Sequence, residues 1–307
     1  MWKIYYKNLI GGQNPDFWGE KLKNLDVGCA KEMGKEDYIK EIFLKYFPKK
    51  GKILDAGCGT GQHVLAYRDL GYQIEGLDFS AKAIERIIKF DNNAPCSKGD
   101  ILQIKAPDRS YECYYSLGVF EHFEEGPFAA IEEARRILRD NGIFMLSIPY
   151  ENLFRIIKFN ILNLIRKLIG QSYISTNVGF IKKVNRYCKP DKLNDHMEFH
   201  EYICSKNEII NLLTFNGFRI EYSSPCSIIW GLLEIPYMRG IYRLINNNLQ
   251  KKSKTARYGE VPEKIRKRNL LKDIVIYEKR NGVFKSFIVK LLGYMFGNLF
   301  LVVCRKA

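Results

Sequence analysis

The chain has 307 residues, of which 46% are hydrophobic, so it can bury a sizeable core in one large domain or two modest ones. Its net charge of +15 is uneven: residues 1–150 have a balance of −1, whereas residues 151–307 have a balance of +16. A basic half suits nucleic acid, an anionic membrane surface or an acidic substrate, and a Lys-rich solvated face is the simpler alternative. The eight cysteines include no CxxC pair and no Cys/His cluster, which argues against zinc and favours reduced thiols.

No targeting or membrane-spanning segment is expected. The N-terminus lacks an apolar run followed by a small-residue cleavage site, and the most apolar stretch, residues 284–303, is interrupted by Lys290 and Gly297-Asn298. We therefore expect a cytoplasmic protein, with peripheral attachment to the inner membrane surface as the alternative.

Strand-like and helix-like patterns alternate along the first half of the chain. Residues 1–48 are expected to form an N-terminal helical cover, which includes a helix over 36–46. Strands are predicted at 52–56, 72–78, 94–100, 111–117 and 143–149. Helices are predicted between them, from a cap at Thr60 to about residue 70, from a cap at Ser80 to about residue 90, and over 126–139.

After residue 149 the alternation pauses and then resumes. Ser205 is expected to cap a helix that ends near residue 216, and strands are predicted at 218–224 and 299–304. The segments 151–200 and 225–297 are then insertions into a single domain spanning residues 1–307. We expect the two insertions to form a substrate lid.

This alternation predicts an α/β fold with a Rossmann-like, doubly wound sheet of seven strands and helical insertions. The last run is too apolar for a sheet edge and follows a tight Gly-Asn turn. It is therefore expected to lie antiparallel between strands five and six, which gives the strand order 3-2-1-4-5-7-6.

Three glycines follow the first predicted strand in the stretch ILDAGCGTG, at Gly57, Gly59 and Gly61. Glycine in a loop costs chain entropy, so three together indicate a close approach to the backbone. A dinucleotide fingerprint has the spacing GxGxxG, whereas this loop has GxGxG, which argues against a dehydrogenase. The ligands of open parallel sheets lie beyond the carboxyl ends of the strands, where this loop is predicted.

At these residues the sequence resembles the class I S-adenosylmethionine-dependent methyltransferases. ILDAGCGTG is similar to their first motif, and further similarity lies in GLDFS (76–80), GD (99–100), YYSLGVFEHF (114–123) and RRILRDNGIFMLSIP (135–149). The resemblance is strong over residues 50–150 and extends through 200–220. It implies S-adenosylmethionine as cofactor and methyl transfer as the reaction.

The resemblance also implies which residues contact the cofactor. Asp55 would bind the amino group of its methionine part, Asp78 the two ribose hydroxyls and Asp100 the adenine amino group. Glycine in the loop would let the backbone pass beside the methionine part. The full set of implied cofactor-binding residues is Asp55, Gly57, Gly59, Gly61, Asp78, Phe79, Asp100, Ile101, Ser116 and Leu117.

Three residues are candidates for the acceptor side. His122 follows the fourth strand, where the family often has an acceptor-side His, and His200 and Tyr202 precede the helix that leads to the sixth strand. A hydroxyl acceptor benefits from a general base, and these side chains could supply one. Packing or capping is the alternative role for each, and no metal site is expected.

The sequence excludes some acceptors. No (D/N)PPY stretch follows the fourth strand, which argues against the enzymes that methylate the amino groups of adenine and glutamine. No Pro-Cys pair is found there either, which argues against methylation of cytosine. A small-molecule, sugar or lipid-linked acceptor, methylated at oxygen, is the first hypothesis. An RNA methyltransferase that uses the basic half is the alternative, although no RNA-binding appendage is found and nucleic acid is not the expected partner. A cofactor-binding protein without catalysis is the third.

The apolar composition of the insertions favours an apolar acceptor pocket. In residues 152–170, Leu153, Ile157, Ile161, Leu164 and Leu168 share a helix face, and Arg155, Lys158 and Arg166 lie on another. Such a helix can lie in an anionic membrane interface, and a core helix that covers the active site is the alternative. Residues 228–245 have a similar character, and residues 251–272 form a basic loop.

Overall fold

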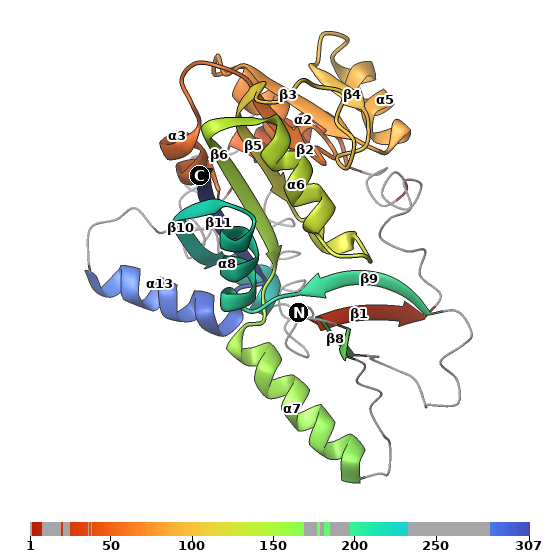
Figure 1. Cartoon of the computed structure of the whole chain (residues 1–307), viewed down its shortest axis with the longest axis vertical. Coiled ribbons are helices and arrows are strands. Elements are labelled where there is room, and N and C mark those ends of the chain that lie inside the picture. Colours follow the sequence, from red (N-terminus) through yellow and green to blue (C-terminus); the bar gives the residue numbers. More distant parts are fainter. Residues whose placement is uncertain are drawn as a thin grey trace, which may run out of the picture.

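The computed structural model describes residues 2–7, 20, 25–35, 37, 39–168, 177–178, 181–184, 197–232 and 283–307. Its centre is a seven-stranded sheet (Figure 1). The strands of this sheet are β2 (Ile53–Ala56), β3 (Ile74–Asp78), β4 (Cys96–Lys98), β5 (Tyr111–Leu117), β6 (Leu138–Pro149), β10 (Phe218–Cys226) and β11 (Leu299–Lys306).

The strand order confirms the predicted fold. The sheet runs β10-β11-β6-β5-β2-β3-β4, which is the order 6-7-5-4-1-2-3 in chain sequence. Strand β11 is antiparallel to both neighbours, with Leu299 opposite Pro149 of β6 and Cys226 of β10. Strands β2 to β6 are parallel, so their carboxyl ends meet at one edge of the sheet.

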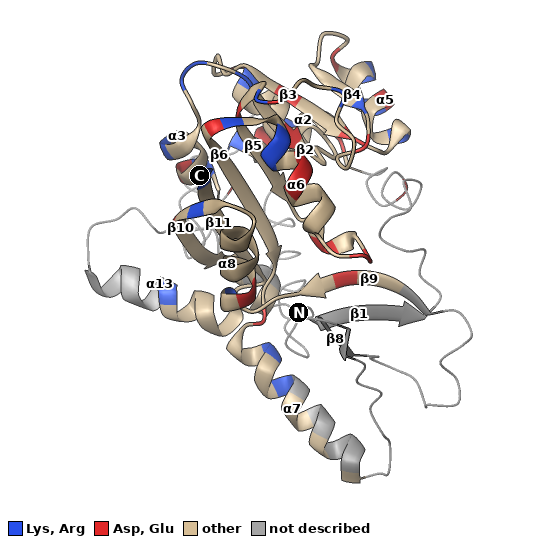
Figure 2. Cartoon of the chain, in the orientation of Figure 1, with Lys and Arg blue, Asp and Glu red and all other residues tan. Residues whose placement is uncertain are grey.

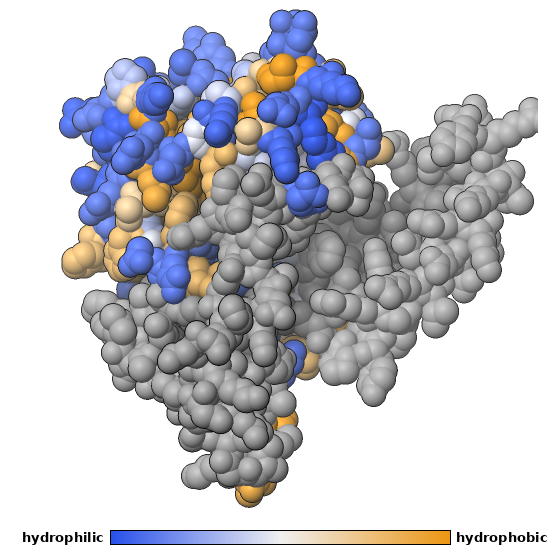
Figure 3. All heavy atoms as spheres, turned by 90° about the vertical axis from the view of Figure 1, so that its right-hand side faces the viewer, coloured by the Kyte–Doolittle hydropathy of each residue, from blue (hydrophilic) through white to orange (hydrophobic). Residues whose placement is uncertain are grey.

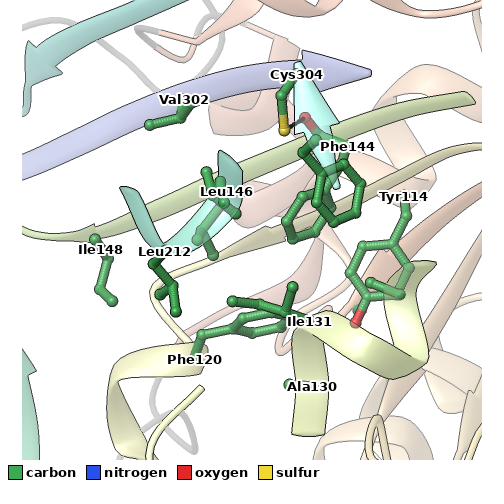
Figure 4. Close-up of a cluster of buried hydrophobic side chains, with 14 of the residues drawn as sticks. Tyr114, Phe120, Ala130, Ile131, Phe144, Leu146, Ile148, Leu212, Val302 and Cys304 are labelled. Atoms are coloured by element: carbon green, nitrogen blue, oxygen red, sulfur yellow. Dashed lines mark hydrogen bonds between the residues drawn. The ribbon is translucent and has the colours of Figure 1, made fainter. Parts of the chain in front are cut away.

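Helices pack on both faces of the sheet. One core contains side chains of α6 (Phe128–Ile137) and α8 (Lys206–Phe215), together with Tyr114 of β5 and Phe144 of β6 (Figure 4). The other core contains side chains of α2 (Val27–Lys35), α3 (Lys40–Tyr46), α4 (Gln62–Arg68) and α5 (Ala81–Phe90). Cys113 and Tyr115 belong to this second core, because successive side chains of a strand point to opposite faces.

A second, four-stranded sheet was not predicted. It runs β7-β8-β1-β9 and combines β1 (Trp2–Lys7) with β7 (Asn177–Val178), β8 (Ile181–Val184) and β9 (Met197–Ile203). The expectation of one sheet, and of a helical cover over all of residues 1–48, is therefore wrong at residues 2–7. Strand β1 finds its partners about 180 to 200 residues away in the chain, so no local pattern marks the pairing.

Two of the three predicted helix caps are present. The Ser80 hydroxyl accepts from the Ala83 amide, and Ser205 forms a reciprocal capping box with Glu208. The predicted cap at Thr60 is wrong: α4 begins at Gln62, and its N-cap residue is Gly61, which has a left-handed conformation (φ +68°) and makes no side-chain cap. Thr60 belongs to the tight glycine loop, whose path places the helix start one residue later.

The first insertion begins with the predicted amphipathic helix, α7 (Leu153–Leu168), which projects from the body of the protein (Figure 1). Its apolar residues Leu153, Ile157, Ile161, Leu164 and Leu168 are exposed, as predicted for one face. The prediction that Arg155 shares a basic helix face with Lys158 and Arg166 is wrong at Arg155. It is buried, and its guanidinium donates to the carbonyl oxygens of Tyr150 and Asn298 and to the Asn298 side chain.

The second insertion is described only at its two ends. These are α9 (Ile228–Leu232), which starts the stretch predicted over 228–245, and α13 (Val283–Phe296), which contacts α7 and β10. The rest of that stretch, the basic loop 251–272 and the side chain of Arg166 lie outside the described residues. Among the helices that the structure describes, none combines the length and apolar character needed to cross a bilayer.

Candidate active site

The predicted cofactor residues gather at the carboxyl edge of the sheet, where three contacts join the strand ends. The Gly59 amide donates to Asp78 Oδ2 (2.8 Å), and the Gly99 amide donates to the Asp78 carbonyl oxygen (2.9 Å). The Ser116 hydroxyl donates to the Ala56 carbonyl oxygen (2.7 Å). The ends of β2, β3, β4 and β5 therefore form one connected rim.

Asp78 ends β3 and is buried, with 6% of its surface exposed. Its Oδ1 accepts from the Ser80 amide (2.9 Å) and its Oδ2 from the Gly59 amide (2.8 Å). Burial raises the pKa of this carboxyl, and the two amide hydrogen bonds oppose the rise. Since each carboxylate oxygen can accept more than one hydrogen bond, both can still accept from the hydroxyls of a ribose.

Asp55 lies inside β2 and is buried. Burial raises its pKa to about 6, and the nearby His63 ring and Tyr115 hydroxyl oppose this shift. The Nε2 atom of His63 lies 3.0 Å from the Oδ2 atom of Asp37. Because the pKa of Asp55 is higher in the folded state than the ordinary value of 3.8, folding stability is lost as the pH rises through about 6. A carboxylate that costs stability in this way is well suited to bind a cationic amino group.

The glycines of the loop are required by the chain itself. Gly57, Gly59 and Gly61 all have positive φ angles, of 86°, 53° and 68°. A Cβ at Gly57 would lie 2.4 Å from Val119 Cγ2, and a Cβ at Gly61 would lie 2.9 Å from Ile87 Cδ1. The first contact shows that the turn after β5 packs directly on the glycine loop.

The remaining cofactor-side residues lie on the same edge. Phe79 follows Asp78 and is half-buried, Asp100 is exposed after β4, and Ile101 is buried. Asp100 Oδ1 accepts from the Leu102 amide (2.8 Å), which orients the carboxylate at the rim. Ser116 is buried and Leu117 half-buried at the end of β5, where the Ser116 hydroxyl joins β5 to β2.

The structure brings the three acceptor-side candidates together, although His122 and the other two are nearly 80 residues apart in the chain. His122 closes the short turn η1 (Phe120–His122), which contacts β9. Its Nδ1 lies 2.6 Å from the His200 carbonyl oxygen, and the two imidazole rings are 5.5 Å apart. Because a carbonyl oxygen only accepts, Nδ1 carries the hydrogen.

Tyr202 is fully buried on β9. Its hydroxyl donates to the Glu124 carbonyl oxygen (2.6 Å), and its ring packs 5.0 Å from that of Phe199. These contacts explain the position of Tyr202 as an anchor for the turn between β5 and α6. Its predicted catalytic role stays a prediction.

Glu121 lies beside His122, and the sequence analysis missed it. The carboxyl is 3% exposed, its Oε1 lies 4.0 Å from His122 Nε2, and its Oε2 is buried without a hydrogen-bond partner in the described part of the chain. Figure 2 shows acidic residues on this turn and on β9 close to each other. The signal in the sequence was the acid directly before His122, whose burial only the tertiary fold determines.

No metal ligands cluster in this region. Within the ranges that the structure describes, no group of three or more His, Cys, Asp and Glu side chains could hold a metal ion.

The rim residues fit the cofactor that the sequence resemblance implied. Asp78 offers hydrogen-bond acceptors for a ribose, and Asp55 offers a buried negative charge for an amino group. Residues 54–146 match the family model described as Methyltransferase domain. This match confirms the predicted methyltransferase domain over these residues, with S-adenosylmethionine as its methyl donor.

Curated relatives match about a third of the chain. A probable S-adenosylmethionine-dependent methyltransferase from Mycolicibacterium smegmatis is 26% identical over 32% of this chain and 37% of its own length. A malonyl-[acyl-carrier protein] O-methyltransferase from Yersinia pestis is 34% identical over 31% and 35%. A ubiquinone biosynthesis O-methyltransferase from Pelagibacter ubique is 29% identical over 36% and 50%. The chain thus spans between about a third and a half of the length of these relatives.

A solved structure shares the fold of almost the whole chain. The phospholethanolamine N-methyltransferase 2 of Haemonchus contortus superposes with a TM-score of 0.51 at 13% identity, over 98% of this chain and 61% of its own length. This likeness concerns the fold alone.

Proposed function

We propose that this chain, which carries a class I S-adenosylmethionine-dependent methyltransferase domain over residues 54–146, methylates the oxygen of a small-molecule, sugar or lipid-linked acceptor. The observation that carries the proposal is the rim of the sheet, where Asp55 directly precedes the glycine loop and Asp78 accepts from the Gly59 amide of that loop. Three of the matching relatives are O-methyltransferases by name, which supports oxygen as the acceptor atom.

The cofactor-side residues have distinct roles in this proposal. Asp78 holds the ribose hydroxyls, Asp55 the amino group, and Asp100 with the Ile101 amide the adenine ring. Ser116 and Leu117 border the methionine end, and Ser116 keeps β5 against β2. The bound cofactor supplies an activated methyl group on a positively charged sulfur. The protein then contributes mainly by positioning the acceptor and excluding water.

The acceptor side is formed by the turn after β5, by β9 and by the insertions. The exposed apolar face of α7 supports a lipid-linked acceptor, because five large aliphatic side chains on one helix face solvent. Hydrophobic surface is visible at the lower end of the molecule, where α7 projects (Figure 3). Peripheral contact with an anionic membrane is part of this proposal, and the charge of the second half of the chain favours it.

Calorimetry tests the core of the proposal. The wild-type protein should bind S-adenosylmethionine and S-adenosylhomocysteine and should not bind NADH. Binding of NADH with no heat from either sulfur ligand would refute the proposed function. The RNA alternative remains a prediction, since its basic loop lies outside the described residues. Binding to bulk tRNA with a steep salt dependence would favour it.

A further inference from the structure

The carboxyl of Glu121 is buried without a hydrogen-bond partner for one of its oxygens. Glu121 lies in η1, directly after β5, and only 3% of its surface is exposed. Oε2 has no partner within the described residues, whereas Oε1 lies 4.0 Å from His122 Nε2. A buried polar atom left unpaired lowers stability, so a group of this kind calls for a ligand that pairs with it.

The position of Glu121 links it to the cofactor loop. A Cβ at Gly118 would lie 3.6 Å from Glu121 Oε1, which places the carboxyl over the residue that directly follows β5. The next residue, Val119, packs against Gly57 of the glycine loop. Strands β2 and β5 are neighbours in the sheet, so Glu121 lies beside the rim that carries Asp55.

The surroundings of this carboxyl disfavour its charged form. Burial raises the pKa of Glu121 well above its usual range, and the negative charge of Glu201 on β9 adds to this effect. The His122 imidazole lies beside this carboxyl, and the His200 ring of β9 packs against that imidazole. The third element packed on this turn, β6, ends in Ser147, Ile148 and Pro149, which carry no charge. A positive charge brought close to Glu121 would favour its charged form.

We propose that Glu121 is the base that takes the proton of the acceptor hydroxyl, and that it ionises when a sulfonium binds on the rim. The inference rests on the proposed function. The acceptor oxygen bonds to the methyl carbon, the sulfur keeps the electron pair of the broken bond, and the hydroxyl proton moves to Glu121 Oε2. The acceptor group at this position is then a neutral hydroxyl. His122 positions the Glu121 carboxyl, because the hydrogen bond from Nδ1 to the His200 carbonyl oxygen fixes the imidazole beside it.

The test compares two ligands that differ by the methyl group and the positive charge. S-adenosylmethionine is a sulfonium and S-adenosylhomocysteine is not, while their ribose, adenine and amino-acid parts are the same. Calorimetry in buffers of different ionisation enthalpy measures the protons released by each ligand. The wild-type protein should release up to about one proton more with the sulfonium. The affinity ratio should correspondingly shift in favour of the sulfonium by up to about tenfold for each unit of rising pH.

Two variants assign the released proton. Glu121→Gln keeps the size of the side chain and cannot ionise, so the difference between the two ligands should disappear while S-adenosylhomocysteine still binds. Glu125→Gln is the matched control, because Glu125 is an exposed acid on the same loop, and its difference should equal that of the wild type.

The outcomes separate this inference from the proposed function. If the wild-type protein binds both ligands with equal proton release, the role of Glu121 is refuted and the proposed function stands, whatever the variant does. If the extra release persists in Glu121→Gln, the proton belongs to another group and the inference is equally wrong. If neither ligand binds the wild-type protein, both proposals fail together.

Discussion

The cofactor side and the acceptor side of the carboxyl edge are held together by different kinds of contact. On the cofactor side, Asp78 is bound by the amides of Gly59 and Ser80, which lie within 19 residues of it in the chain. On the acceptor side, the contact between His122 and His200 spans 78 residues, and that between Arg155 and Asn298 spans 143.

This difference explains why the sequence predicted more of the cofactor side than of the acceptor side. A site built by strand ends and the loops that follow them depends on short stretches of sequence. A site built by pairing distant segments depends on how the whole chain folds. The following predictions test this contrast, from the largest expected effect to the smallest.

The largest effect is expected for Asp78→Ala. Losing the acceptors of two ribose hydroxyls should cost about 2–4 kcal/mol of binding free energy, or roughly 30- to 1000-fold in affinity for both S-adenosylmethionine and S-adenosylhomocysteine. Calorimetry measures this, and Asp78→Asn, which keeps one acceptor oxygen, should lose less. Wild-type affinity in Asp78→Ala would show that the cofactor side is not where we place it.

Gly57→Ala tests the joint between the two sides. Gly57 and Gly71 have the same φ of +86°, but a Cβ at Gly57 meets Val119 and a Cβ at Gly71 meets nothing within 4 Å. Gly71→Ala should therefore cost about 1–2 kcal/mol of folding free energy for backbone strain alone. Gly57→Ala should cost about 1–3 kcal/mol more, because the turn after β5 must move. Denaturant titration of both variants gives the difference, and equal costs would contradict the packing of Val119 on the loop.

Arg155→Gln tests the long-range contacts of the acceptor side. The variant removes the guanidinium hydrogen bonds to the carbonyl oxygens of Tyr150 and Asn298, each of which keeps one backbone amide donor. Losing these charge-assisted bonds should cost about 1–3 kcal/mol of folding free energy. Lys158→Gln on the same helix is the control and should change stability by less than about 0.5 kcal/mol. If thermal melting gives the two variants the same stability, Arg155 does not hold α7 to the body of the protein.

Leu164→Asn tests the exposed face of α7. Leu164 is 60% exposed, and Leu70, on another part of the surface, is 57% exposed. If α7 enters a membrane interface, Leu164→Asn should weaken binding to vesicles that contain phosphatidylglycerol by about tenfold, whereas Leu70→Asn should leave it unchanged. Vesicle flotation at two salt concentrations measures this. A wild-type protein that does not float at low salt would exclude the membrane contact.

The sequence by itself determined the large sheet, its strand order and the cofactor rim. Alternating strand and helix patterns, the GxGxG loop and acids at the ends of successive strands act over short distances, and the structure places Asp55, Asp78 and Asp100 at one edge as these patterns indicate. The capping serines Ser80 and Ser205 were predictable for the same reason, since a cap bonds to an amide only a few residues away.

Only the tertiary structure decided the small sheet, the burial of Arg155 and the isolation of Glu121. Strand β1 pairs with β8 and β9, and nothing in the sequences of those strands identifies β1 as their partner. The helical spacing of Arg155 predicts an exposed side chain, whereas in the structure it is buried and bonded to Asn298. The Glu121 carboxyl becomes buried because β9 packs against its turn. Burial and long-range pairing are properties of the assembled chain, because they depend on which distant segments exclude water from a side chain.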